Sequence, residues 1–178
     1  MPIKGRIAIT GRPGVGKTTL IERILERLSV PAGGMLTVET RVCGHRVGFE
    51  IRDVATGAAG VLAHVHHREG PKIGRYTVDL VSVREVGVAA IDRAISSAAL
   101  VVIDEIGPME LASPDFVPSV ERALASDAAL LISTHANADC PIAHRVRQEL
   151  ELFRVKLGNR DRLVDEIVER FLGDAAAN

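Results

Sequence analysis

The sequence predicts an α/β fold in three layers, with a mainly parallel central sheet, helices on both faces and an antiparallel hairpin near residues 36–54. Short apolar runs alternate along the chain with segments whose apolar residues recur every three or four positions, as in doubly wound sheets. The run Leu100-Val101-Val102-Ile103 is aliphatic throughout, which is typical of a central parallel strand covered on both faces.

Composition and charge favour one globular domain, which we expect over residues 1–173 with a frayed tail at 174–178. The chain has 178 residues and a net charge of −1, so it has no general attraction to polyanions and no nucleic-acid partner is expected. The first residues contain no secretory or membrane-spanning apolar stretch, which predicts a cytoplasmic protein without a membrane. Cys43 and Cys140 lie far apart and indicate neither a disulfide framework nor a zinc site.

The N-terminal third begins with a predicted strand at 6–10 and a helix at 17–29. Pro31 and the pair Gly33-Gly34 are expected to end that helix. Two β-rich runs, 36–42 and 46–54, then predict the hairpin.

The middle of the chain has less regular patterning. Residues 55–75 predict a loop with one short strand at 61–65, followed by a strand at 76–81 and a helix at 83–98. The remaining predicted elements are strands at 100–103, 129–133 and 153–157, helices at 114–126 and 142–150, and a closing helix that contains Leu163, Ile167 and Phe171.

The strongest motif lies between the first strand and the first helix and has the pattern GxxxxGK[ST]. It reads Gly11-Arg12-Pro13-Gly14-Val15-Gly16-Lys17-Thr18. The glycines let backbone N–H groups surround a phosphate at a helix N-terminus, so we expect all eight residues to bind nucleotide. Lys17 is expected to act in catalysis at the β- and γ-phosphates, Thr18 to bind Mg²⁺ and Thr19 to contact the α-phosphate. A glycine-rich turn with a solvated Lys17 explains the Lys-Thr pair poorly.

Two carboxylates follow the aliphatic strand, at the sheet edge where open α/β folds bind ligands. We expect Asp104 to serve Mg²⁺ and Glu105 to polarise the water that attacks the γ-phosphate. The alternative is a helix-capping pair. Glu110 is a third carboxylate, for which a site role and loop solvation both remain open.

Polar residues also follow two other predicted strands at this edge. In Ser133-Thr134-His135 we favour His135 as a catalytic contact to the water or the γ-phosphate, although these side chains could instead satisfy loop backbone groups. Asn159 and Arg160 could contact the nucleotide base, and Asn159 could also cap the last helix.

The loop before residue 76 carries further candidates. For His64, His66 and His67 the spacing favours a solvated loop over a metal site. Basic residues follow, and they could supply an arginine finger in cis or remain an exposed charged loop. They are Arg68, Lys72 and Arg75.

The phosphate motif together with Asp104-Glu105-Ile106-Gly107-Pro108-Met109-Glu110-Leu111 and Asn159-Arg160-Asp161 resembles a family of P-loop nucleoside-triphosphatases. It is the family of the thermophile nucleoside-triphosphatase-phosphatases and the human cancer-related nucleoside-triphosphatase. The similarity runs nearly end to end, including the segment at 73–80. The resemblance implies the P-loop NTPase fold and Mg²⁺-dependent hydrolysis of ATP, GTP and other nucleoside triphosphates with broad base tolerance.

Two other functions share the phosphate loop. A nucleoside or nucleotide kinase needs an acceptor pocket and a lid that excludes water, and the basic segment 68–75 keeps it open. A nucleotide-dependent switch usually carries Asn-Lys-x-Asp, whereas residues 159–161 read Asn-Arg-Asp. Hydrolysis is therefore preferred, with nucleoside triphosphates as the expected partners. The sequence names no protein partner and is compatible with a monomer.

Overall fold

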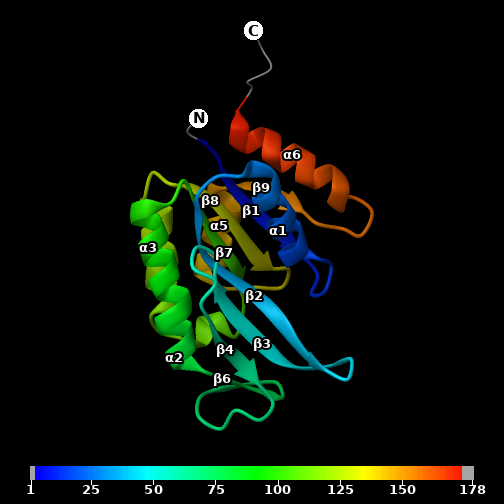
Figure 1. The fold of residues 1–178 in the computed structure, drawn as a ribbon, viewed down its shortest axis with the longest axis vertical. Coiled ribbons are helices and arrows are strands. Elements are labelled where there is room, and N and C mark those ends of the chain that lie inside the picture. The colour runs from blue at the N-terminus through cyan, green and yellow to red at the C-terminus, as the bar shows by residue number, and fades with distance from the viewer. Residues whose placement is uncertain (1–2, 174–178) are drawn as a thin grey trace.

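A computed structural model describes residues 3–173 of the chain (Figure 1). The expected tail at 174–178 lies outside the described residues. Between residues 3 and 173, no helix is both apolar enough and long enough to cross a membrane. The elements are β1 (Arg6–Gly11), α1 (Lys17–Leu28), β2 (Ala32–Val42), β3 (His45–Asp53), β4 (Ala59–His64), β5 (Lys72–Ile73), β6 (Tyr76–Val78), α2 (Leu80–Ser82), the π-helix η1 (Val83–Val88), α3 (Ala89–Ser97), β7 (Leu100–Ile106), the 3₁₀ helix η2 (Glu110–Ala112), α4 (Phe116–Ala125), β8 (Ala129–His135), α5 (Pro141–Glu149), β9 (Glu151–Arg154) and α6 (Arg160–Leu172).

These strands form one sheet in the order β5-β6-β4-β3-β2-β7-β8-β1-β9. The pairs from β2 through β7, β8 and β1 to β9 are parallel. The pairs from β2 through β3, β4 and β6 to β5 are antiparallel and form a wing, by which we mean strands β3 to β6 (Figure 1). The predicted α/β class, with its parallel core and antiparallel hairpin, is confirmed.

Helices cover both faces of the parallel core, as alternate residues of one strand demonstrate. In β1, Ile7 and Ile9 belong to the core beneath α1 and α6, while Ala8 belongs to the core beneath α3, α4 and α5. Figure 1 shows α3 on one side of the sheet and α1 on the other. Side chains alternate between faces in a strand, so strands buried on both sides appear in the sequence as continuous apolar runs.

The glycine pair at 33–34 was expected to end the first helix, and that prediction is wrong. Both residues lie inside β2, whose first part pairs in parallel with β7. A Cβ at Gly34 would lie 2.0 Å from the carbonyl oxygen of Val102, and one at Gly33 would lie 2.8 Å from the Cβ of Ala94. The glycines therefore let β2 approach β7 and α3 closely.

The segment 55–75 is more regular than the predicted loop, because its strands β4 and β5 complete the wing. The strand expected at 76–81 ends at Val78, since the side chain of Asp79 accepts hydrogen bonds from the N–H groups of Val81 and Ser82 and caps a helical turn. The strand expected at 153–157 lies instead at Glu151–Arg154, where it pairs with β1.

Candidate active site

The phosphate motif joins β1 to α1 in the conformation that its glycines allow. Gly14 and Gly16 have φ values of 75° and 98°, which L side chains rarely adopt. Gly16 precedes α1 without a side-chain cap, so the first N–H groups of this helix can bind an anion. The turn therefore has the backbone geometry of a phosphate loop.

Lys17 is buried beside this loop, with 7% of its surface exposed. Its Nζ donates to the carbonyl oxygen of Gly11 at 3.1 Å and lies 3.3 Å from Oε2 of Glu105. That oxygen is buried and accepts no hydrogen bond from any described residue. The ammonium and the carboxylate therefore form an ion pair directly beside the phosphate loop.

Asp104 is fixed by two hydroxyl groups. Oγ1 of Thr18 donates to its Oδ2 at 2.6 Å, and the hydroxyl of Ser133 donates to its Oδ1. Burial raises the pKa of Asp104 to about 6, although these two hydrogen bonds oppose the rise. β7 runs through Asp104 and Glu105 to Ile106, beyond the strand predicted at 100–103, and its register with β8 shifts after Ile103.

Thr18 and Asp104 are the residues that could hold a divalent cation. Within residues 3–173 no group of three or more His, Cys, Asp or Glu side chains could bind a metal ion by itself. Mg²⁺ commonly binds through one or two protein groups, substrate phosphates and water, and this donor set fits it. A cation here would also offset the negative charge of Asp104 and Glu105, which β7 places side by side.

Glu110 is a buried carboxyl group, 3% exposed, in the same site. Its Oε1 accepts from Oγ1 of Thr37 at 3.3 Å, and the same hydroxyl lies 2.7 Å from the carbonyl oxygen of Asp104. Burial, followed by the charge of Glu105, raises the pKa of Glu110 to about 8, so this group is largely protonated at neutral pH. Glu110 thus belongs to the site, and Thr37, on β2, was missed by the sequence analysis.

His135 ends β8 and lines the cavity, but its Nδ1 accepts the backbone N–H of Asn137 at 3.2 Å. In a neutral ring so bonded, the proton lies on Nε2. That nitrogen can donate to a phosphate oxygen, whereas the basic nitrogen is occupied. Of its neighbours, Ser133 bonds Asp104, and Oγ1 of Thr134 is buried without a partner among the described residues.

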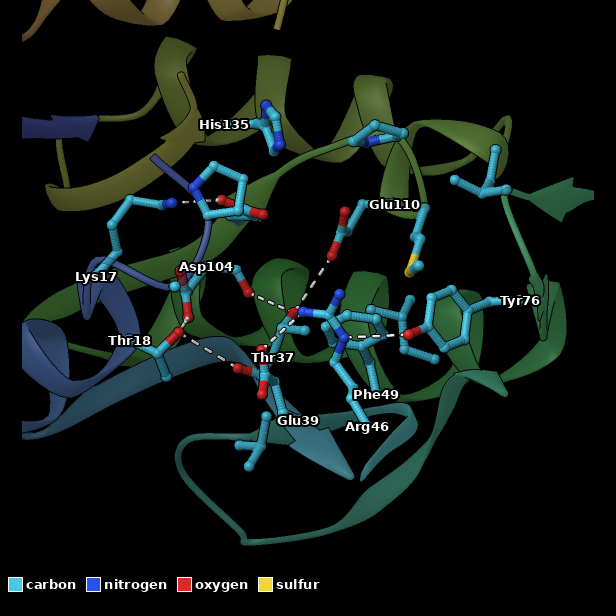
Figure 2. Close-up of a pocket in the computed structure, with 18 of the residues that line it drawn as sticks. Lys17, Thr18, Thr37, Glu39, Arg46, Phe49, Tyr76, Asp104, Glu110 and His135 are labelled. Atoms are coloured by element: carbon cyan, nitrogen blue, oxygen red, sulfur yellow. Dashed lines mark hydrogen bonds and ion pairs between the residues drawn. The ribbon is translucent and has the colours of Figure 1, made fainter. Parts of the chain in front are cut away.

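One cavity of about 650 Å³ unites these groups (Figure 2). Its near end contains the expected residues Pro13, Gly14, Gly16, Lys17, Thr18, Thr19, Asp104, Glu105 and His135. Its far end, a term we keep for Glu39, Arg46, Phe49, Leu62, Ile73, Tyr76 and Met109, comes mostly from β2 and the wing. Sequence patterns gave no signal for the far end, because pairing of distant strands assembles it.

The remaining predicted residues lie on the other side of the phosphate loop. Gly11, Arg12 and Val15 line a second cavity of about 520 Å³, with residues 154–157. Arg160 packs against the loop, and its Nη1 would be 2.9 Å from a Cβ on Gly16.

Two predicted roles are not supported by the geometry. The side chain of Asn159 neither caps α6 nor lines either cavity, because it bonds the N–H of Lys156 and the carbonyl oxygen of Arg154. Arg75 bonds the hydroxyl of Tyr76 and the carbonyl oxygen of Arg46, so the basic loop does not place an arginine finger in the cavity.

Comparison with known proteins identifies the family of the chain. The sequence model of the NTPase family matches residues 6–168. The chain belongs to this NTPase family. A relative from Methanosarcina acetivorans, the nucleoside-triphosphatase THEP1, is 46% identical over 171 residues, which are 94% of this chain and 97% of the relative. Another THEP1, from Thermofilum pendens, is 46% identical over 165 residues, covering 89% of this chain and 91% of the relative.

Two solved structures share the NTPase-family fold. The crystal structure of THEP1 from Aquifex aeolicus matches with a TM-score of 0.85 at 29% identity and covers 93% of this chain and 98% of that one. The solution structure of a human cancer-related nucleoside triphosphatase matches with a TM-score of 0.76 at 34% identity, covering 92% and 95%. The resemblance seen in the sequence and the P-loop NTPase fold are both confirmed.

Proposed function

We propose that this protein hydrolyses nucleoside triphosphates to diphosphate and phosphate, with Mg²⁺ as cofactor and broad base tolerance. Membership of the NTPase family supports the reaction class. The observation that carries the proposal is the convergence of Lys17, the Thr18–Asp104 pair and Glu105 on one cavity at the phosphate loop. A cation, a metal-binding pair and a further carboxylate at one phosphate site are the parts that phosphoanhydride hydrolysis needs.

Nucleotide binding changes the partner of Lys17. The β- and γ-phosphates would lie against the N–H groups at the start of α1, where the Lys17 ammonium exchanges Glu105 for phosphate oxygen. Thr18 and Asp104 would hold Mg²⁺, which neutralises charge on the phosphate oxygens when bound. His135 would donate from Nε2 to the γ-phosphate.

Glu105 is the residue that we assign to water activation. Once Lys17 contacts phosphate instead of Glu105, the Glu105 carboxylate can accept a proton from the attacking water. The water oxygen then bonds the γ-phosphorus, the bond to the β–γ bridging oxygen breaks, and the diphosphate leaves. Glu110, with its pKa raised to about 8, is mainly a hydrogen-bond donor at neutral pH and supports this arrangement rather than acting as the base.

The second cavity, where we expect the nucleoside to rest, supports broad base tolerance. Apart from the hydroxyl of Thr10, its side chains are cationic or apolar, as in Arg12, Val15 and Arg154, and no side-chain carboxylate or amide lines it. Cations and apolar faces stack on every base, whereas selection of one base needs directed polar groups. The amide of Asn159 is already bonded to backbone.

The test measures phosphate release from ATP, GTP, CTP and UTP with Mg²⁺ and with chelator. We expect all four to be hydrolysed with Mg²⁺ and none with chelator. Lys17→Ala should lower kcat about 10²–10³-fold without loss of fold, since it removes one preorganised charge. Lys72→Ala, on the edge strand β5, is the matched control. Turnover in folded Lys17→Ala near that of the control would refute the proposal.

A further inference from the structure

The cavity is larger than hydrolysis requires. It measures about 650 Å³, in the range of small-molecule sites, while a water molecule occupies about 30 Å³. The phosphate loop and the carboxylates occupy only its near end, and the nucleoside of the triphosphate is expected in the second cavity. The far end therefore has room for another molecule beside the γ-phosphate (Figure 2).

The far end is built from aromatic residues that this chain otherwise uses sparingly. The sequence contains four Phe, one Tyr and no Trp. Phe116, Phe153 and Phe171 are buried in the two cores and line neither cavity. Tyr76, the single tyrosine, belongs to one core and Phe49 packs against that core, but both also line this cavity. Their rings meet edge to face with centroids 5.4 Å apart and an interplanar angle of 70°. Such a pair fixes both rings against each other and leaves aromatic surface at the cavity wall.

Charged groups hold this wall in place. Arg46 lies with Cζ 5.2 Å from the centroid of the Phe49 ring, donates from Nε to the hydroxyl of Tyr76 at 3.1 Å, and pairs with Glu39 at 3.0 Å. Burial would raise the pKa of Glu39, but hydrogen bonds from Arg46 and Arg41 hold it below its ordinary value, so the carboxylate stays ionised. A cation over an aromatic face beside a carboxylate suits a heteroaromatic ring with polar edges.

We propose that the far end of the cavity binds a nucleoside, and that a hydroxyl of its sugar can replace water as acceptor of the γ-phosphoryl group. The inference rests on the phosphate site of the proposed function. The base would pack against the Phe49–Tyr76 pair beside Arg46, with its polar edge toward Glu39, while the apolar side chains of Leu62 and Met109 enclose it.

The groups between the two ends select a hydroxyl rather than a phosphate as acceptor. Glu105 lines the cavity beside the phosphate loop, where the acceptor atom would approach, and its carboxylate repels an anionic acceptor. A neutral sugar hydroxyl instead gives its proton to Glu105 as its oxygen bonds the γ-phosphorus. The bond to the β–γ bridging oxygen breaks, so the products are a nucleoside monophosphate and a nucleoside diphosphate. Water gives the hydrolytic outcome by the same route.

The experiment incubates the protein with Mg²⁺ and ATP labelled at the γ-phosphate, together with adenosine, guanosine, cytidine or uridine. D-ribose provides hydroxyls without a base and is the negative control. Labelled nucleoside monophosphate and labelled inorganic phosphate are measured in the same reaction. We expect label in at least one nucleoside and none in ribose.

Variants test where the nucleoside binds. Phe49→Leu keeps an apolar side chain but removes the aromatic face, so the KM for the nucleoside should rise about tenfold relative to any change in phosphate release. Phe153→Leu is the matched control, because Phe153 is buried beneath α1 and α6 and lines neither cavity. Arg46→Met should raise the KM for the nucleoside in the same way as Phe49→Leu. This second variant keeps the test decisive if the first one does not fold.

The outcomes separate the two proposals. Phosphate release without labelled nucleoside overturns this inference and leaves the proposed hydrolysis standing, whereas absence of both products overturns both. Equal labelling of ribose and nucleosides overturns the aromatic subsite. An unchanged nucleoside KM in Phe49→Leu and Arg46→Met overturns the far end as the binding place.

Discussion

Replacing Glu110 by glutamine should stabilise the protein, and more so as the pH rises. Burial raises the pKa of this carboxyl from 4.5 to about 8, so between these values the folded chain keeps a proton that the unfolded chain releases. The stability contribution of the proton is complete below pH 4.5 and is lost as the pH rises through about 8. The Glu110→Gln variant lacks the titrating group, so its unfolding free energy does not fall with pH for this reason.

The magnitude follows from the size of the shift. At about 1.4 kcal/mol per unit, the full shift corresponds to about 5 kcal/mol of unfolding free energy. Part of it depends on the charge of Glu105, and the glutamine amide must itself be buried, so we expect a net gain of about 2–4 kcal/mol at pH 9. For a chain of this length that is a rise in Tm of about 5–15 °C.

Calorimetry of the nucleotide-free protein at pH 5, 7 and 9 measures this effect. Glu169→Gln is the matched control, since Glu169 is exposed on α6 and its substitution should shift Tm by little at any pH. The reasoning predicts a Tm difference between Glu110→Gln and the parent that is small at pH 5 and largest at pH 9. A difference that is the same at all three pH values would refute it.

Three further substitutions have definite expected outcomes. Glu105→Gln should lower single-turnover hydrolysis about 10²-fold or more while nucleotide still binds, and a rate within about threefold of the parent would remove Glu105 from the base role. Asp104→Asn should raise the Mg²⁺ concentration needed for half-maximal activity about 10-fold or more and should weaken nucleotide binding as well. A Mg²⁺ titration of activity measures this effect, and an unchanged titration would remove Asp104 from the metal site. Gly34→Ala should lower the unfolding free energy by several kcal/mol, because its Cβ would lie 2.0 Å from the carbonyl oxygen of Val102. Denaturant unfolding measures this change, and a loss below about 1 kcal/mol would contradict the close approach of the two strands.

Local sequence patterns predicted the parallel half of the molecule well. The motif at Gly11–Thr18 and the carboxylates after the aliphatic run depend on strand ends, and parallel strands bring their carboxyl ends to one edge. Asp104 and Thr18 therefore met as expected. Their roles in binding and catalysis stay predictions until the variants above are measured.

The wing was predicted poorly because long-range pairing defines it. Thr37 reaches Asp104 across 67 residues of sequence, and Arg46 reaches Tyr76 across 30, with no local periodicity to indicate either contact. Gly33 and Gly34 misled the analysis for a related reason. Glycine marks both chain reversals and close backbone approaches, and only the position of β7 distinguishes the two.

The strand β2 belongs to both the parallel core and the antiparallel half of the sheet, because it pairs with β7 and with β3. At about 3.3 Å per residue its eleven residues form a rod of about 36 Å, which enters the sheet beside β7 and leaves it beside β3. Thr37 sits near the midpoint, bonded to Asp104 and Glu110, and Glu39 follows it toward the tip. A chimaera that exchanges the wing between relatives must therefore transplant β2 with it. A junction placed between core and wing would cut through the segment that positions the carboxylates.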